Sequence, residues 1–499
     1  MSVQNIKIHD KDNVAVMLGD GKSGQWLKVG NETIVLKEDI AAGHKVALQE
    51  MATGTEIIKY GNAIGSITEN IMAGSWVHSH NLKTNLDGKL TYSYNPLQTD
   101  RENKQKSSVT FKGYRRGNQD VAIRNEIWII NTVGCINKSA ELLAKLATKE
   151  LTTADEVDEI RSFPHPFGCS QLGDDLKYTQ QFLSSLVQHP NAAGVLVMGL
   201  GCENNTIQSF QSMVGEVKDK KVMFFSAQEV DDELEEGLQC ISELVEYANT
   251  FQKEDIPISE LKIGLKCGGS DGFSGITGNP LVGRFSDRLI EMGGTAIMTE
   301  VPEMFGAETL LMNRAESEDV FHKTVHLVND FKDYFIRHNQ VVYENPSPGN
   351  KEGGITTLEE KSLGCVQKVG SAPIVDVLSY ASRAERNGLN LLQGPGNDLV
   401  SVSNLAAAGA HIVLFTTGRG TPYGGPVPTV KISTNTTLAR KKKRWIDFNA
   451  GQIVEGANIE GVAEELLEYI IKLASGEVQT QNEKYEFKEI AIFKDGVIL

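Results

Sequence analysis

Hydrophobic positions follow two different patterns along the chain. In residues 1–82, short aliphatic and β-branched runs such as VAVML, ETIVL and HKVAL are separated by the Gly, Asn and Asp residues typical of turns. This pattern predicts a small all-β domain. Residues 83–110 are polar, rich in turn-forming residues and poor in aliphatic side chains, which predicts an extended linker.

Beyond the linker, strand-like runs alternate with amphipathic helical patterns. EIWIINTV precedes KSAELLAKLATK, and GVLVMGLG precedes NNTIQSFQSMV. Such alternation predicts parallel sheets covered by helices, that is, an α/β fold. A polar stretch at residues 252–255 is interpreted as a break between a first α/β domain, residues 111–250, and a C-terminal α/β domain, residues 251–499.

Size and charge narrow the classes of function. The 499 residues exceed the roughly 250–300 at which one hydrophobic core usually stops growing, which agrees with several domains. A net charge of −16 disfavours nucleic acid or an anionic membrane as a partner, because both require a basic surface. The most apolar run, residues 192–200, is half the ~18 residues needed to cross a bilayer, and the N-terminus lacks a signal-peptide pattern. We expect a cytoplasmic protein that acts on a small molecule, by default as a homodimer.

Five of the six cysteines stand beside a glycine, at the carboxyl end of a predicted strand (Cys135, Cys202, Cys267) or in a loop (Cys169, Cys365). Cys240 falls in a predicted amphipathic helix and is expected in the core. One such pair would fit simple burial, because free cysteine is among the most buried residue types. Ligands of open parallel sheets, however, bind beyond the carboxyl ends of the strands. Five pairs therefore favour at least two cysteines at a functional site.

Three further segments carry chemistry. WVHSHN would place His78 and His80 on one face of a strand, a geometry that suits chelation of a divalent ion, although two surface or core histidines would read the same. The glycine-rich residues 267–280 would form a nest of N–H groups for a carboxylate, or a plain long turn. Arg419 of TGRGTPYGG would hold a carboxylate bidentately, or lie solvated in a turn.

Ten segments resemble the altronate and galactarate dehydratase family, and they cover the chain from end to end. They are GHKVAL, IIKYGNAIG, WVHSHN, RNEIWIINTVGC, HPFGCSQLGDD, GLGCENN, LKCGGSDGFSGITGNPLVGRFSD, TEVPEMFGAE, YENPSPGNKEGGITTLEEKSLGC and TTGRGTPYGG. The resemblance implies an SAF-like, β-clip domain at the N-terminus and a Rossmann-like α/β region in two parts. The first part is then a candidate for dimerisation and the second for catalysis.

The resemblance also implies a reaction. It is the dehydration of D-altronate to 2-keto-3-deoxy-D-gluconate and water in hexuronate (galacturonate) catabolism, assisted by Fe²⁺ or Mn²⁺. Dehydration of galactarate is the alternative within the family. Two interpretations of other kinds stay open: a non-catalytic carbohydrate-binding protein, and a hydro-lyase whose cysteines hold an iron–sulfur cluster.

The expected site residues follow from these motifs and the implied reaction. A divalent ion would stabilise the charge that develops when a base removes the proton at C2. The candidate metal ligands are His78 and His80 with Cys202 or Glu203; a metal held wholly in the α/β region by Glu203 and Asp271 is the alternative. Ser270, Asp271, Asn279 and Arg419 are the candidate substrate-binding residues, and His78, His80 or Lys266 the candidate acid or base.

Overall fold

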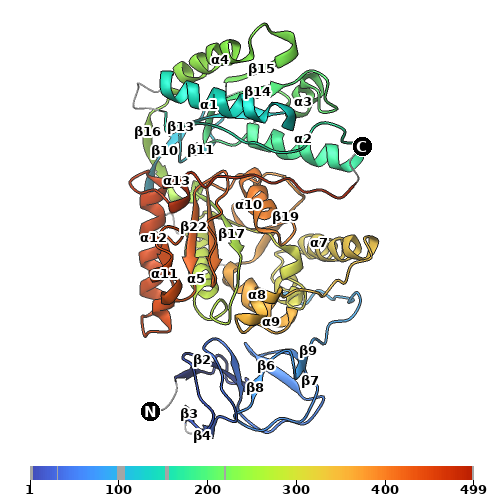
Figure 1. Ribbon diagram of the computed structural model, residues 1–499. Coiled ribbons are helices and arrows are strands. Elements are labelled where there is room, and N and C mark those ends of the chain that lie inside the picture. Colours follow the sequence, from blue (N-terminus) through green and yellow to red (C-terminus); the bar gives the residue numbers. More distant parts are fainter. Residues whose placement is uncertain (1–3, 31, 98–106, 152–156, 218–220, 497–499) are drawn as a thin grey trace.

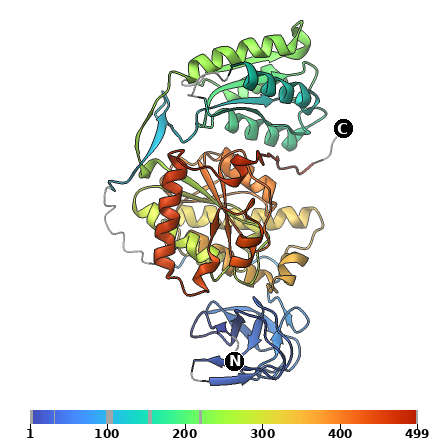
Figure 2. The ribbon, with the colours of Figure 1, turned by 60° about the vertical axis from the view of Figure 1, so that its left-hand side comes forward.

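The computed structural model describes residues 4–30, 32–97, 107–151, 157–217 and 221–496. These residues form three parts stacked one above another, with the N-terminal domain at one end and the first α/β domain at the other (Figures 1 and 2). The N-terminal part consists mostly of strands and the rest is α/β, as the hydrophobic patterns predict. Within the described segments, no helix has the length and apolar character needed to span a membrane.

The N-terminal domain is built from short antiparallel strands joined by tight turns. They form sheets in the orders β1-β2-β5-β8, β3-β4 and β6-β7-β9. The aliphatic runs of the sequence become strand interiors, and all four residues of β2 are buried. The strands are β1 (Asn5–Ile6), β2 (Val14–Met17), β3 (Trp26–Val29), β4 (Glu32–Val35), β5 (Lys45–Ala47), β6 (Glu56–Lys59), β7 (Asn62–Ile67), β8 (Trp76–Val77) and β9 (Leu82–Lys83).

The first α/β domain has a parallel sheet in the order β13-β12-β14-β15. The central strands β12 and β14 are buried along their whole length, which explains why they read as continuous apolar runs. Helices α1 and α4 pack against each other, as do α2 and α3. The elements are β12 (Glu126–Asn131), η1 (Gly134–Ile136), α1 (Asn137–Leu151), β13 (Glu159–Ser162), α2 (Gly173–Val187), β14 (Ala192–Gly199), α3 (Ile207–Val214), β15 (Lys221–Ser226), η2 (Ala227–Glu229) and α4 (Glu233–Ala248). Cys240 lies buried in α4, as predicted.

A small antiparallel sheet joins the two α/β domains. It has the order β11-β10-β16, from β10 (Thr110–Arg115), β11 (Val121–Ala122) and β16 (Lys253–Pro257). The polar residues 252–255, interpreted from the sequence as a break, lie mostly in β16. The segment therefore lies between the two α/β domains, where the break was placed. It is a strand, however, which the sequence did not indicate because β16 is exposed along most of its length and pairs with β10.

The C-terminal domain has a seven-stranded sheet in the order β19-β20-β18-β17-β21-β22-β23, with every pairing parallel. Its strands are β17 (Lys262–Cys267), β18 (Thr295–Met298), β19 (Ile374–Leu378), β20 (Gly388–Leu392), β21 (Ile412–Thr417), β22 (Thr429–Ser433) and β23 (Phe448–Asn449). Its helices are η3 (Ile258–Glu260), α5 (Gly278–Glu291), η4 (Val301–Glu303), α6 (Glu308–Met312), α7 (Glu318–Arg337), α8 (Pro348–Glu352), α9 (Leu358–Cys365), η5 (Val366–Val369), α10 (Asp398–Ala407), α11 (Thr436–Lys441), η6 (Gly451–Ile453), α12 (Ile459–Ala474) and α13 (Gln481–Lys484).

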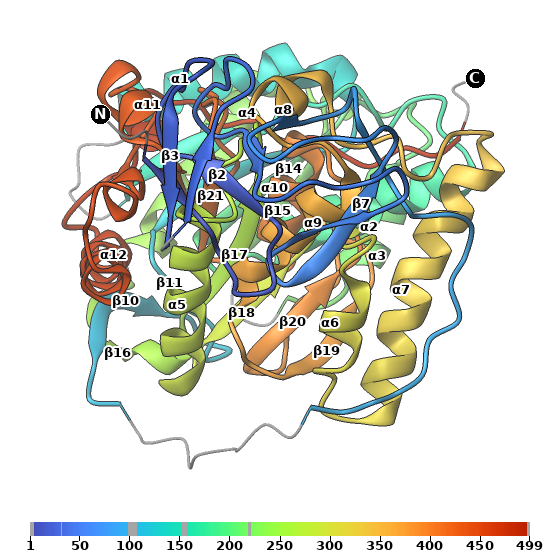
Figure 3. The same ribbon diagram turned by 90° about the horizontal axis from the view of Figure 1, so that it is seen from below.

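The expected linker lies along the C-terminal domain. Residues 84–97 and 107–109 carry neither helix nor strand, and residues 98–106 of the expected linker lie outside the described residues. Residues 84–97 run beside α7 (Figure 3). Tyr92 Oη donates a 2.6 Å hydrogen bond to Glu308, and Tyr94 Oη donates a 2.9 Å bond to the carbonyl of Ala315. This segment is therefore extended, as predicted, but attached to the domain it passes.

A buried charge triad docks the N-terminal domain on α9. Lys45 of β5 lies 2.8 Å and Lys59 of β6 lies 2.7 Å from the carboxylate of Glu360. All three side chains are at most 1% exposed. Burial of charge is costly unless the charges are paired, so this contact holds the N-terminal domain in one position over the C-terminal domain.

His411, just before β21, joins the C-terminal domain to the small sheet as a neutral ring. Its Nδ1 accepts the Lys262 N–H at 3.0 Å, and its Nε2 lies 2.8 Å from the carbonyl of Val121 and donates to it. Both ring nitrogens are therefore used by one tautomer. Burial lowers the pKa of His411 to about 3.

We expect His411 to make stability depend on acid. The lowered pKa means that the unfolded chain takes up the proton first, so the contribution is fully present above pH 6.5 and is lost as the pH falls toward 3. The loss is on the order of a few kcal/mol. The slope of melting temperature against pH between 6.5 and 4 should flatten in His411→Asn and stay unchanged in His322→Asn, at an exposed helical position. An equal slope in both variants would contradict this role.

Candidate functional site

The carboxyl edge of the seven-stranded sheet holds a cluster of buried ionisable side chains. The chain winds outward from β17 in both directions, to β18 and β20 on one side and to β21, β22 and β23 on the other. In open parallel sheets, ligands bind at the point where the winding reverses. Cys267 ends β17, Glu300 follows β18 closely, and Arg419 follows β21. The topology of the sheet therefore predicts a ligand site at the same edge as the sequence does.

Two thiols and a carboxylate form the centre of this cluster. Cys267 Sγ lies 3.2 Å from Cys365 Sγ, and Glu303 Oε2 lies 2.9 Å from the first sulfur and 3.1 Å from the second. All six cysteines lie in the described segments and none forms a disulfide. The three ligand atoms lie within 4.8 Å of one another, a spacing that could hold a metal ion. They come from three separate elements, β17, η4 and α9.

Three buried lysines surround this centre. Lys266 Nζ contacts Glu300 and lies 2.9 Å from Asp398, and Lys361 Nζ lies 2.8 Å from Glu303. The third lysine, Lys368, lacks such a close partner among the described residues.

The Lys368 ammonium has no hydrogen-bond partner among the described residues. Its nearest carboxylate oxygen is that of Glu300 at 3.8 Å, and its side chain is fully buried. A buried ammonium without a hydrogen bond costs free energy, so it is a candidate donor to a ligand at this site.

The lysines and thiols shift one another's pKa values. A hydrogen bond from Cys365 lowers the pKa of Cys267 to about 6, and the charges of Lys368 and Lys266 act in the same direction. The same contact raises the pKa of Cys365. Burial would raise the pKa of Glu303, but the charges of Lys361, Lys266 and Lys368 outweigh it and keep that pKa below its usual range. A thiolate and a carboxylate therefore face each other at neutral pH.

Glu300 behaves differently from Glu303. Burial raises its pKa well above the ordinary value, and the negative charges of Cys267 and Glu303 add to this effect. Its backbone is left-handed, with φ of 73°, a conformation that costs a non-glycine residue on the order of 1–3 kcal/mol and is typical of functional sites. A buried carboxylic acid with a raised pKa can donate a proton at neutral pH.

The charges around the centre suit a divalent ion. With Cys267, Glu303 and Asp398 counted as anions, the three lysines are balanced. Release of the proton held by Cys365 then supplies one further negative charge, and an anionic ligand would supply the second, so that Glu300 keeps its proton. Thiolate and carboxylate are both ligands of ferrous iron, so the residues present fit the cofactor that the sequence implies.

The glycine-rich segment after β17 lies beside the thiols. Ser270 Oγ is 3.5 Å from Cys267 Sγ. Asp271 accepts hydrogen bonds from Ser274 and Thr434, and Asn279 accepts one from Thr416, so these two side chains fasten the segment to its surroundings. The glycine-rich segment therefore forms a turn in the structure. Anion binding by this segment stays a prediction.

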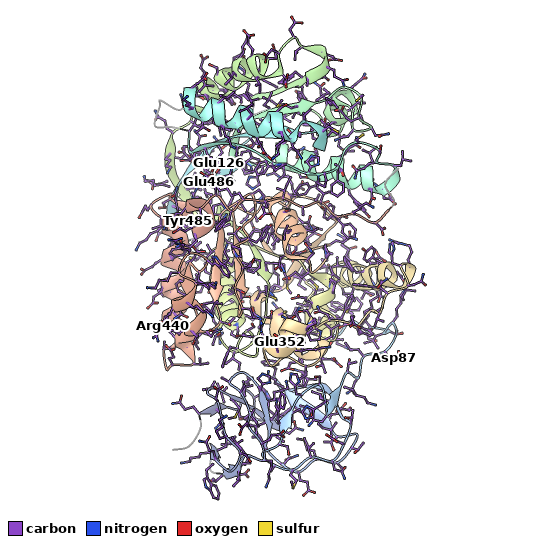
Figure 4. The ribbon with its side chains drawn as sticks, in the orientation of Figure 1. Asp87, Glu126, Glu352, Arg440, Tyr485 and Glu486 are labelled. Atoms are coloured by element: carbon purple, nitrogen blue, oxygen red, sulfur yellow. The ribbon has the colours of Figure 1, made fainter. Side chains whose placement is uncertain are left out.

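Arg419 lies at the rim of this edge and is 47% exposed. Its guanidinium donates to the carbonyl of Gly349 at 3.3 Å and to Glu352 at 3.2 Å. Figure 4 shows Glu352 at α8, near the boundary with the N-terminal domain. The arginine is therefore near the entrance rather than in contact with the buried centre.

A small cavity borders the centre, and the N-terminal domain contributes to its lining. Tyr60, Ser270, Asn279 and Cys365 are among its lining residues, and Tyr60 comes from the N-terminal domain. Its volume of about 10 Å³ suits a single water molecule. A six-carbon sugar acid requires more room, so this arrangement is a closed one.

The two histidines do not form the strand-face pair that the sequence indicates. β8 ends at Val77, because the Asn81 side chain accepts the His78 N–H at 2.9 Å and turns the chain. His78 is buried, lies with Nε2 2.8 Å from the carbonyl of Lys351, and has a pKa lowered to about 4 by burial. His80 is exposed and packs on Trp76.

Cys202 and Glu203 lie in the first α/β domain, just after β14, and not with the histidines (Figure 1). Glu203 accepts hydrogen bonds from the hydroxyl of Thr132 at 2.6 Å and the N–H of Gly201 at 2.7 Å. These bonds lower its pKa although burial opposes them. The structure therefore does not assemble His78, His80, Cys202 and Glu203 as one site, and it also separates Glu203 from Asp271.

Most of the buried charged residues were not predicted from the sequence. Lys266 and Cys267 were singled out, but Lys266 is held between two carboxylates, and this pairing keeps its pKa well above normal despite burial, which disfavours the role of a base. Glu300, Glu303 and Lys361 were not proposed, although they lie in segments that carry the family resemblance. Cys365 was expected in a loop and ends α9. A charged residue shortly after an apolar strand is a signal that could have pointed to Glu300, whereas Glu303 and Lys361 lie in helices and have no such signal.

Family models match the chain over nearly its whole length. Residues 3–85 match the altronate/galactarate dehydratase SAF domain. Residues 113–249 match the D-galactarate dehydratase/altronate hydrolase second domain, and residues 258–498 match the D-galactarate/altronate dehydratase C-terminal domain.

Individual proteins are similar over the same extent. The chain is 53% identical to an altronate dehydratase of Bacillus subtilis (strain 168) over 495 residues, 99% of each chain. It is 52% identical to an altronate dehydratase of Escherichia coli (strain K12) over 497 residues, 100% of each. Identity to the galactarate dehydratase (L-threo-forming) of E. coli (strain K12) is 34% over 516 residues, 98% of this chain and 96% of the other.

Proposed function

The chain belongs to the D-galactarate/altronate dehydratase family, and from this premise we propose that it dehydrates D-altronate to 2-keto-3-deoxy-D-gluconate. The higher identity to the two altronate dehydratases than to the galactarate dehydratase favours altronate. A cytoplasmic location and a homodimer stay predictions from the sequence.

One observation supports the site of this reaction above others. Cys267, Glu303 and Cys365 place three ligand atoms within 4.8 Å at the winding reversal of the large sheet. We propose that these residues hold the Fe²⁺ or Mn²⁺ ion, in place of the histidines. Bound there, such an ion would act as a Lewis acid toward the substrate carboxylate.

The other residues of the cluster then take defined roles. Lys368, whose ammonium lacks a hydrogen bond among the described residues, would bind the substrate carboxylate. Asp398 would accept the C2 proton, because its side chain is 34% exposed and can be reached by the substrate, whereas that of Glu300 is fully buried. Glu300 would donate a proton to the departing C3 hydroxyl, which leaves as water. The resulting enol becomes the ketone by proton transfer to C3.

Access to this site requires movement of the N-terminal domain. The closed cavity holds about one water molecule and is lined by Tyr60 of that domain. We propose that the domain opens to admit the sugar acid and closes to exclude water during the reaction.

The substrate is tested by parallel assays of the reduced, Fe²⁺-loaded protein under anaerobic conditions. We expect formation of the 2-keto acid from D-altronate, with kcat/KM at least about tenfold higher than for galactarate, because the two acids differ at polar groups that a site must pair. A preference for galactarate would reassign the substrate within the family. Binding of D-altronate without product from either acid would favour a carbohydrate-binding protein and contradict the proposal.

A further inference from the structure

Three exposed cysteines lie at one edge of the first α/β domain, apart from the proposed active site. Cys135 follows β12, Cys169 follows β13 and Cys202 follows β14, and these three strands are neighbours in the sheet. Free cysteine is usually buried, so exposure of three in one place is unusual. The proposed dehydration uses none of them.

The parallel register brings two of these cysteines to the same level. Asn131 of β12 pairs with Met198 of β14, and Cys135 and Cys202 each follow four residues later. Parallel strands end at the same edge of a sheet, so both thiols belong to its carboxyl edge, where ligands of such sheets bind.

Hydrogen bonds join the three cysteine loops to one another. The N–H of Gly134 donates to the carbonyl of Phe167 at 2.8 Å, and the N–H of Asn205 donates to the carbonyl of Gly168 at 3.1 Å. The N–H of Ser170 donates to the side chain of Asn204 at 2.7 Å. Every one of these groups lies within three residues of a cysteine, so the loops form one connected surface.

The glycine before each cysteine permits this close approach. A Cβ at Gly134 would lie 2.5 Å from the carbonyl oxygen of His165, and one at Gly168 would lie 2.0 Å from that of Thr132. Gly168 also has φ of 100°, and Gly201 has φ of 125°. The loops therefore need glycine at these positions to pack as they do, and the adjacent cysteines stay exposed.

Glu203 fixes the base of this surface. Its carboxylate ties the β12 end at Thr132 to the loop N–H of Gly201, next to Cys202. The Gln228 side chain donates to Cys202 Sγ at 3.7 Å, and hydrogen bonds to sulfur are among the features that adjust a bound metal centre. Glu203, expected from the sequence as a metal ligand, therefore holds the loop that carries Cys202.

We propose that Cys135, Cys169 and Cys202 hold a [4Fe–4S] cluster, with the fourth iron left to a non-protein ligand. Thiolates are the usual ligands of such clusters, and each binds a different iron, so they stand further apart than the ligands of a single ion. Among the described residues, Cys267, Glu303 and Cys365 form a group with ligand atoms within 4.8 Å and the three exposed cysteines do not, so the latter are not a site for a single ion of that kind. Binding releases the three thiol protons and requires no change in the oxidation state of the protein.

The test measures cofactor content and is independent of the proposed activity. The full-length protein is reconstituted anaerobically with equal parts of ferrous and ferric iron and with sulfide, which together match the oxidation state of a [4Fe–4S]²⁺ cluster. It is then desalted and assayed for iron, acid-labile sulfide and visible absorbance. We expect a brown protein with about four sulfides per chain. Cys169→Ser, and the triple replacement of all three cysteines by serine, should lose at least roughly tenfold of the sulfide, whereas Cys365→Ser should keep it.

Three results would overturn the proposal: no sulfide in the wild-type protein, equal sulfide in the wild-type protein and the triple variant, or a disulfide between two of the three cysteines in the anaerobic protein. The cysteines are exposed, so serine should leave the melting temperature of the protein without cluster nearly unchanged. Failure of altronate turnover alone would not bear on this test, because its readout is the cluster.

Discussion

Replacing Cys365 with serine is expected to lower turnover of D-altronate by about 10³-fold or more. In protein loaded with Fe²⁺ without sulfide, and therefore free of cluster, it should also reduce bound Fe²⁺ to a small fraction of that in the wild-type protein. Its sulfur lies 3.2 Å from Cys267 Sγ and 3.1 Å from Glu303 Oε2, at the centre of the proposed metal site. A serine hydroxyl stays protonated at neutral pH and is a weaker ligand than a thiolate for this ion. Loss of a metal that stabilises developing charge removes several kcal/mol from the catalysis.

The matched control for this variant is Cys240→Ser. Cys240 is also a buried cysteine, but it lies in α4 of the first α/β domain. Its replacement should cost some stability and leave the iron content and kcat/KM nearly unchanged. Wild-type iron content and turnover in a folded Cys365→Ser protein would remove this residue from the site.

Glu360→Gln is expected to cause the largest loss of stability, about 3–5 kcal/mol, because it leaves two buried ammonium groups without their shared carboxylate. Lys45 and Lys59 are fully buried at 2.8 and 2.7 Å from this carboxylate. The triad lies between the N-terminal domain and α9, so the change should also free that domain. Thermal unfolding measures the first effect, and the rate of proteolytic cleavage within residues 83–110 measures the second.

Two further variants sharpen this test. Asp39→Asn breaks an exposed ion pair with Lys22 and should change stability by less than about 1 kcal/mol. Replacing Lys45, Lys59 and Glu360 together by Met, Met and Leu should recover much of the lost stability, because no unpaired charge remains buried. A Glu360→Gln protein as stable and as resistant to protease as the wild type would show that the triad does not hold the domain.

The order of elements could be predicted because it depends on local patterns. The buried strands β12, β14 and β21 read as continuous apolar runs, and the alternation with helices indicated parallel sheets. β16 was missed for the opposite reason, since it is mostly exposed and its polar residues resemble a linker. Periodicity reports burial, and an exposed strand carries little of that signal.

The candidate site was predictable only in part. Cys267 was found because it ends a strand beside glycine, and a glycine neighbour likewise marked Cys365, although its partners were not apparent. Lys266, Glu300 and Asp398 are separated by tens of residues in the sequence and meet only when the three strands β17, β18 and β20 align. Pairing of this kind depends on tertiary contacts and has no local signal.

The histidine pair illustrates the reverse error. WVHSHN has strand-like spacing, but Asn81 accepts the His78 N–H and the chain turns after Val77. An asparagine side chain that competes for backbone hydrogen bonds is enough to end a strand. His78 and His80 therefore do not lie on a strand, and both rings pack against Trp76 instead.

Locating iron in crystals grown anaerobically with Fe²⁺ tests the central claim most directly. An anomalous difference map at the iron absorption edge identifies the metal without reference to activity. We predict a peak bonded to Cys267, Glu303 and Cys365, whether or not a cluster is present at the other three cysteines. A peak at His78 and His80, with none between the two buried thiols, would contradict the assignment of the metal to the carboxyl edge of the seven-stranded sheet.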